Sequence, residues 1–166
     1  QQAGVTGSAP YSGDPDSDAA NSAAGAQEQV PPEHQEAYML AQQGDYAGAA
    51  AAYEKVLEAD PNDARAARER AKALLLARSA NANVREVRAA AADNSDDVEA
   101  QLAVADIDMI GGQIQDAFDR LLDFVAAGHK ADIEPVRKRL LEYFTIPEPT
   151  DERLKRARRR LATLMY

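Results

Sequence analysis

The stretch Gly44-Asp45-Tyr46-Ala47-Gly48-Ala49-Ala50-Ala51-Ala52-Tyr53 decides the fold, because its pattern returns further along the chain. The same order recurs 68 positions later and pairs Gly44 with Gly112, Ala49 with Ala117, Tyr53 with Leu121 and Val56 with Phe124. A small residue also recurs at Ala37, Ala71 and Ala105, each step being 34 positions. The chain therefore contains an internal repeat.

A period of 34 residues is that of the tetratricopeptide (TPR) repeat, a helix–turn–helix unit that stacks on copies of itself. Alanine at the shared positions lets one helix approach the next closely, and Tyr53 or Leu121 fills the space beside it. The pattern predicts an all-α fold, a TPR-like right-handed solenoid of about eight helices with three hairpins and a C-terminal helix pair. Solenoids of this kind present extended binding surfaces.

Turn and capping residues predict where the helices begin and end. Gly44 is expected to take the left-handed conformation that ends a helix, and Asp45 is expected to cap the next one. The turn Asp60-Pro61-Asn62-Asp63 is expected to end that helix and cap the next, and Asn83 is expected to cap a short helix. Thr150 is expected to cap the last helix. The middle repeat lacks the Gly-Asp-Tyr turn, so its second helix is predicted to be short or shifted.

Composition divides the chain near Pro31. Residues 6–30 are rich in Gly, Ser, Ala, Asp and Pro and show no helical or strand period, so residues 1–30 are predicted to be a disordered linker. Residues 31–166 are predicted to form the helical domain. The net charge of −9 argues against general binding of nucleic acids, and no apolar run approaches the length of a membrane span.

The residues that carry catalysis are scarce in this chain. It has no cysteine and only two histidines, His34 and His129, neither with a partner at ligand spacing. The aspartates within residues 14–18 imitate the start of a calcium loop, but Ala19 and Gly25 stand where that loop needs glycine and glutamate. We therefore predict no enzymatic activity, no cofactor and no metal site.

TPR arrays bind partners on the concave surface lined by the first helix of each repeat. A clamp for a peptide carboxylate is rejected, because Glu69 and Glu99 stand at two of the matching positions and would repel it. The remaining candidate groove residues are Tyr38, Arg68, Lys72, Asp106 and Met109. These positions fit ordinary amphipathic helix faces equally well.

The last helix combines an apolar stripe with arginines. Leu154, Ala157, Leu161 and Leu164 are spaced by 3, 4 and 3 positions, and the arginines of residues 156–160 lie mostly off that stripe. One interpretation is a helix that covers the last repeat, as solenoids require. Met165 and Tyr166 lie beyond the last full turn, where an apolar end flanked by arginines is typical of a helix that docks into a partner's groove.

Two parts of the chain resemble a known family. The first runs through Asp97-Val98-Glu99-Ala100-Gln101-Leu102-Ala103 and Gly111-Gly112-Gln113-Ile114-Gln115-Asp116-Ala117-Phe118. The second comprises Val136-Arg137-Lys138-Arg139-Leu140-Leu141-Glu142-Tyr143-Phe144 and the ending Arg158-Arg159-Arg160-Leu161-Ala162-Thr163-Leu164-Met165-Tyr166. Together they resemble the C-terminal TPR region of actinobacterial YbbN/CnoX-type thioredoxin-like co-chaperones, also called chaperedoxins. The resemblance covers about residues 31–166.

The resemblance implies a thioredoxin-like domain, absent here, that precedes the linker. Members of the family hold non-native client proteins and pass them to Hsp70 and Hsp60 chaperones, with a C-terminal helix implicated in chaperonin contact. By that resemblance the contact is expected at Leu161, Leu164, Met165 and Tyr166.

We therefore expect a cytoplasmic protein-binding TPR module of a co-chaperone. The alternative is a scaffold that binds one specific folded partner or associates with itself.

Overall fold

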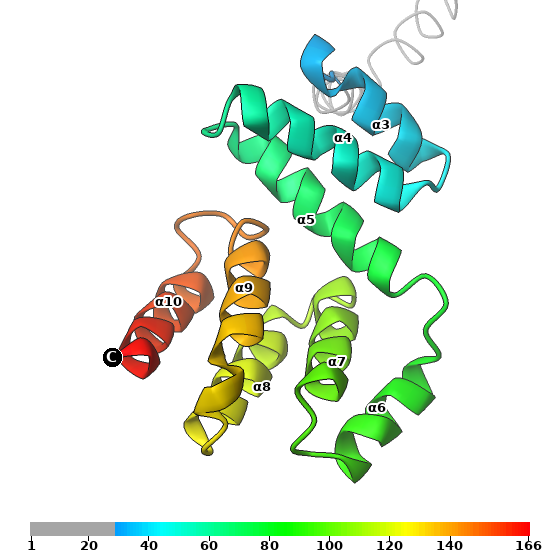
Figure 1. Cartoon of the computed structure of the whole chain (residues 1–166). Helices are drawn as coiled ribbons and strands as arrows, with labels where there is room; N and C mark the ends of the chain where they lie inside the picture. The colour runs from blue at the N-terminus through cyan, green and yellow to red at the C-terminus, as the bar shows by residue number, and fades with distance from the viewer. Residues whose placement is uncertain (1–28) are drawn as a thin grey trace, which may run out of the picture. The chain divides into compact units, whose positions relative to one another are not determined.

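The computed structural model describes residues 29–166 and divides them into two units (Figure 1). Nearly all of the predicted linker, residues 1–30, lies outside the described residues, so its disorder stays a prediction. The described part of the first unit, residues 29–35, contains the short 3-10 helix η1, Pro32–His34. There the side-chain amide of Gln35 donates a hydrogen bond to the carbonyl of Val30 at 2.9 Å.

The second unit, Glu36–Tyr166, holds the repeats, and the predicted all-α TPR-like solenoid is confirmed. Residues 29–166 form eight α-helices and no strand (Figure 1). The helices are α3 Gln35–Gln42, α4 Tyr46–Ala59, α5 Ala64–Arg78, α6 Val84–Asp93, α7 Val98–Ile110, α8 Ile114–Ala126, α9 Ile133–Tyr143 and α10 Glu152–Met165. A second 3-10 helix, η2 Lys130–Asp132, precedes α9.

Most predicted helix boundaries are confirmed, and the capping residues expected there make the hydrogen bonds that define them. The carboxylate of Asp45 accepts a hydrogen bond from the backbone N–H of Gly48, and Asp63 and Asn83 cap α5 and α6 in the same way. Each cap satisfies a backbone donor that a helix start leaves without an intrahelical partner. Gly44, at a φ of 83°, closes α3 in the left-handed conformation that glycine adopts without strain.

The predicted cap of the last helix is wrong by one residue. Asp151, and not Thr150, is the N-cap of α10, and its carboxylate accepts the backbone N–H of Arg153 at 2.8 Å. The Arg153 guanidinium also pairs with the same carboxylate at 2.7 Å. Both residue types cap helices well, and the arginine two positions on favours the aspartate because only the aspartate is charged.

The helices α3, α4 and α5 pack through small side chains. Their buried cluster contains six alanines and one large residue, Tyr53. Ala49 of α4 and Ala66 of α5 are fully buried, so the two helix backbones lie close together. The predicted role of alanine as the small residue of the repeat is visible in this seam, which we call the alanine seam.

The helices α7 to α10 pack around large side chains. Their cluster, which we call the large core, contains Phe118, Leu122, Leu140 and Tyr143, all fully buried, together with Leu75 of α5. Phe118 packs edge-to-face on Phe144, with ring centroids 5.3 Å apart. Both α9 and α10 pack against α8.

The middle repeat departs from the regular pattern, as predicted. Its second helix, α6, has 10 residues, while α5 before it has 15. After Arg78 the chain leads away from α5, so that α6 packs against α7 and does not fold back along α5 (Figure 1). As a result, α6 and α8 lie on opposite sides of α7, and a space remains between α6 and α8.

Candidate protein-binding surfaces

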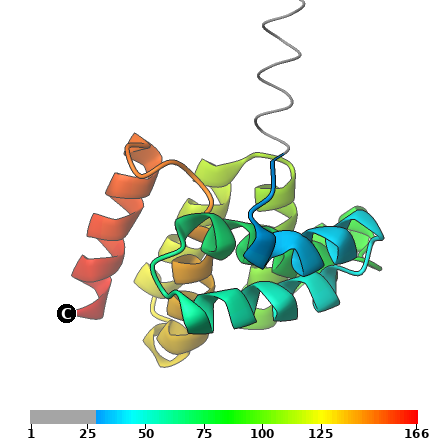
Figure 2. The same ribbon diagram turned by 90° about the horizontal axis from the view of Figure 1, so that it is seen from above.

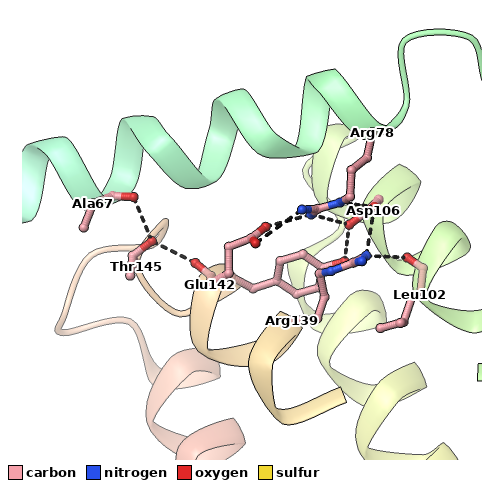
Figure 3. A network of polar contacts seen from close by, with 8 residues as sticks. Ala67, Arg78, Leu102, Asp106, Arg139, Glu142 and Thr145 are labelled. Carbon is pink, nitrogen blue, oxygen red and sulfur yellow. Dashed lines mark hydrogen bonds and ion pairs between the residues drawn. The ribbon is translucent and has the colours of Figure 1, made fainter. Parts of the chain in front are cut away.

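A buried carboxylate on α7 binds side chains from two other helices, α5 and α9 (Figure 3). Asp106, 3% exposed, accepts hydrogen bonds from Arg78 Nε at 2.9 Å and Arg78 Nη2 at 3.0 Å. Arg139 Nη1 donates to the same carboxylate at 3.0 Å, and the Tyr143 hydroxyl donates to its other oxygen. We call this group the Asp106 network. Because both oxygens are occupied by this chain, Asp106 supports its surroundings and is not open to a partner.

The Asp106 network keeps its partners in fixed protonation states. Burial opposes the charge of Arg78, yet hydrogen bonds to Asp106 and Glu142 outweigh it and raise the pKa of the guanidinium above its usual range. Burial and the negative charge of Asp106 raise the pKa of the Tyr143 hydroxyl well above its usual range. The hydroxyl therefore remains a donor across the physiological pH range.

The same network joins α5 to the large core. Arg78, the last residue of α5, also donates to Glu142 of α9 at 2.7 Å. At the other end of α5, the Thr145 hydroxyl shares its proton between the backbone carbonyls of Glu142, at 2.8 Å, and Ala67, at 3.3 Å (Figure 3). These polar contacts join the alanine seam to the large core at both ends of α5.

The terminal helix α10 lies at one end of the helical array (Figure 2), and it packs against α8 with one face while the other face is exposed. Leu154, Ala157 and Leu161 are buried against the large core, as the covering-helix interpretation predicts. Leu164 and Met165 are only partly buried at its edge, and Tyr166 is 99% exposed. The structure thus places Leu161 in the core, Leu164 and Met165 at its edge, and Tyr166 in solvent.

Arginines of α10 make contacts on its flanks. Arg160 pairs with Asp123 of α8 at 2.6 Å, and Arg156 donates to the side chain of Gln115 at 3.2 Å. Arg158 lies over the ring of Phe144, with 5.9 Å between its Cζ atom and the ring centroid. These contacts orient α10 and leave its outer face strongly positive beside Tyr166.

The other predicted groove residues are dispersed. Tyr38 on α3 is half-buried, Arg68 on α5 is half-buried beside Glu69, and Lys72 is exposed with its ammonium 3.4 Å from Glu69. Met109, 7% exposed, is part of the large core. Of this set, Tyr38, Arg68 and Lys72 can be reached from solvent, so partner contact at these three stays a proposal.

A cavity of about 820 Å³ lies between α6 and α8, with α7 as its floor. We call it the α6–α8 trough, and none of the nine residues proposed from sequence lines it. Its lining contains five aspartates, two arginines and one histidine, but few apolar side chains. The lining residues are Arg88, Ala91, Ser95, Asp96, Gln101, Asp108, Gln113, Asp116, Asp119, Arg120, Asp123, Phe124, Ala127 and His129.

Hydrogen bonds and ion pairs join the floor of the trough to both of its walls. Asp108 of α7, 3% exposed, pairs with Arg88 of α6 at 2.7 Å and lies 3.9 Å from Arg120 Nε of α8. Arg120 donates to the Gln101 side chain at 2.9 Å, and Gln101 donates to the carbonyl of Ala91 at 3.1 Å. The chain of contacts runs from α6 through α7 to α8 and fixes the trough's width.

Sequence reasoning missed both polar groups, although α7 carries a signal for them. Asp106 and Asp108 stand in a helix that is otherwise largely apolar, between Val104 and Met109. A carboxylate that a helix buries requires a cationic or hydroxyl partner from another element. Pairing these two aspartates with the arginines of neighbouring helices would have pointed to both groups.

Within residues 29–166, no helix is both long enough and apolar enough to cross a membrane. The same residues contain no group of three or more His, Asp or Glu side chains placed to hold a metal ion.

Comparison with known proteins places the chain among repeat proteins. A tetratricopeptide repeat family model matches residues 77–166. Uncharacterized proteins of Mycobacterium bovis and Mycobacterium tuberculosis are 30% identical to it over 141 residues, which cover 83% of this chain. The matched segment spans 45% of the length of those relatives. No solved structure matches the chain.

Proposed function

The chain belongs to the tetratricopeptide repeat family, and we propose that it is the protein-binding module of a YbbN/CnoX-type thioredoxin-like co-chaperone. In this proposal a thioredoxin-like domain precedes the module, and the whole protein is cytoplasmic. The module holds non-native clients and docks to Hsp60 or Hsp70 chaperones. Its role is binding, with no chemical step of its own.

The observation that carries the proposal is the end of α10. Tyr166 is 99% exposed, and an exposed aromatic ring at a helix end is well placed to anchor that helix in a partner's pocket. Leu164 and Met165 beside it are only partly covered. Arg158 and Arg159 add positive charge on the exposed face, which helps an acidic groove to capture the end of the helix. This arrangement matches the helix-in-groove mode of recognition.

Deletion of Leu164–Tyr166 tests the docking step. We expect the truncated chain to lose capture of the Hsp60 chaperonin in a pulldown, because the exposed apolar group is removed. Ala162→Ser is the matched control, since Ala162 lies on the exposed face of the same helix. Leu161→Ala separates stability from binding, because this buried residue is expected to lower the free energy of unfolding by about 2–5 kcal/mol. Unchanged chaperonin capture by the truncated chain would contradict the proposal.

A second candidate function is a scaffold that binds one folded partner or a second copy of itself. The polar trough favours it, because charged cavities select specific partners better than they hold varied apolar clients. Light scattering of a heat-denatured test protein separates the two functions. The co-chaperone suppresses aggregation in this assay, whereas the scaffold leaves it unchanged.

A further inference from the structure

We propose that the α6–α8 trough binds a peptide segment of a partner protein that carries arginine or lysine side chains. The inference rests on the proposed function in one respect, that the module binds proteins. It adds a second binding surface, the trough, which is separate from the end of α10 and recognises basic side chains.

The size and lining of the trough favour a peptide. Its volume of about 820 Å³ lies within the range of about 300–1,000 Å³ seen for ligand sites. Sites for small molecules are lined mostly by apolar side chains, whereas Phe124 and two alanines are the apolar residues of this lining. A charged, open trough fits a segment that brings its own charges and backbone hydrogen bonds.

The charge of the trough is unbalanced at one wall. Asp108 on the floor is neutralised by Arg88, and Asp96 at the mouth lies 3.2 Å from the His129 ring. On α8, by contrast, Asp119 accepts a hydrogen bond from the uncharged Gln115 at 2.9 Å and forms no ion pair among residues 29–166. Asp116 makes no hydrogen bond or ion pair within the described part of the chain.

These two carboxylates lie on one face of a helix. Asp116 and Asp119 are three positions apart on α8, and Asp123 continues the same stripe four positions later. A basic side chain of a partner would therefore meet two carboxylates that form no ion pair with any cation of residues 29–166.

An ion pair within the chain shows which kind of side chain this row of carboxylates binds. Arg160 of α10 places its guanidinium 2.6 Å from Asp123, at the far end of the stripe. The carboxylates of Asp116 and Asp119 present the same chemistry toward solvent, and a guanidinium forms short charge-assisted hydrogen bonds with carboxylates. The occupant is therefore basic, and its side chains repeat for Asp116 and Asp119 the contact that Arg160 makes with Asp123.

The trough is also formed before a partner arrives. The contacts from Arg88 through Asp108 and Arg120 hold its two walls at a fixed distance. The His129 ring stacks on Phe124 with 4.1 Å between the ring centroids, so these two lining residues hold each other in place. A site that keeps its shape when empty loses less conformational entropy on binding.

Fluorescence anisotropy of the whole chain with a fluorescein-labelled Arg-Ser repeat peptide tests the proposal. We expect saturable binding that weakens with added salt, and no binding of the matching Glu-Ser peptide. Asp116→Asn combined with Asp119→Asn keeps the side-chain shapes and should raise the Kd about tenfold. Ser95→Lys adds a positive charge to the lining and should also weaken binding.

The matched control removes two charges elsewhere. Glu36→Gln combined with Glu58→Gln changes two exposed carboxylates outside the trough and should leave the Kd within twofold of the unaltered chain. The proposal would be overturned by an equal rise of the Kd in this control or by an unchanged Kd in the Asp116 and Asp119 variant. Equal binding of the acidic peptide would also overturn it. Thermal unfolding of every variant shows whether its fold is intact.

The test is independent of the docking step at α10. Suppose that the Asp116 and Asp119 substitutions weaken peptide binding while the Leu164–Tyr166 deletion leaves chaperonin capture unchanged. The trough proposal is then supported and the co-chaperone proposal is contradicted. If the deletion abolishes capture while the trough variants bind the peptide normally, the trough proposal alone falls.

Discussion

The alanine seam of α3–α5 and the large core of α7–α10 bury their helices by opposite means. In the seam, six of seven buried residues are alanine, so the backbones approach closely but little apolar area leaves water. In the core, phenylalanine, leucine and tyrosine side chains remove far more area. The difference shows that one repeat pattern can be packed with either small or large side chains, and the end of α10 and two of the three helices that line the trough belong to the part with the larger core.

Truncation within the large core gives the largest expected effect. Phe118→Ala should lower the free energy of unfolding by about 3–5 kcal/mol, because it removes a buried ring that packs on Phe144 and leaves a cavity in its place. Urea denaturation followed by circular dichroism measures it. Val84→Ala, at a side chain that is 49% exposed, is the control and should change stability by less than about 0.5 kcal/mol. Equal losses would show that the core does not dominate stability.

Removal of the charge at Asp106 tests the joint between the two regions. Asp106→Asn should cost about 3 kcal/mol or more, since Arg78 and Arg139 lose the carboxylate that compensates their partly buried charges. The exposed Asp93→Asn variant is the control in the same denaturation experiment. A loss no larger than that of the control would mean that the network is not needed to join α5 to the core.

Overpacking should damage the alanine seam. Ala49→Leu should cost about 1–3 kcal/mol, because this alanine is fully buried between helices with no space for a branched side chain. Ala51→Leu, two positions along on the exposed face of α4, should be nearly neutral. If both variants unfold at the same urea concentration as the unaltered chain, the close approach of the helices is not required.

The smallest effect is a pH dependence at the cap of α10. The side-chain hydrogen bond from Arg153 lowers the pKa of Asp151 from 3.8 to about 2. A carboxyl whose pKa is lower in the folded state contributes stability above its unfolded pKa and loses that contribution as the pH falls through the folded one. Asp151→Asn should therefore destabilise the chain slightly at pH values above about 4, and the difference should vanish near pH 2. A difference that is independent of pH would contradict this assignment.

Local features of the sequence were the most predictable. Asp45, Asp63 and Asn83 cap their helices as expected, because a cap depends on a few neighbouring residues. The shift from Thr150 to Asp151 shows the limit, since Arg153 decides between two adjacent residues that both cap well.

The two aspartates within the apolar face of α7 signal buried polar groups, but the sequence pattern does not identify their partners, which lie far away along the chain. Arg78 and Asp106 are 28 positions apart, and Arg78 and Glu142 are 64 apart. The trough depends on the path of α6, which the irregular middle repeat predicts to be shifted without giving its direction. The period of 34 residues specifies which helices exist, whereas the contacts between repeats specify where the chain can bind.

Amide hydrogen exchange of the whole chain, followed helix by helix, tests most directly the claim that two differently packed regions meet at one polar joint. The account predicts that amides of α8, within the large core, exchange with a higher free energy of opening than those of α4 in the alanine seam. Equal free energies of opening in α4 and α8 would contradict it, because the chain would then open as one cooperative unit.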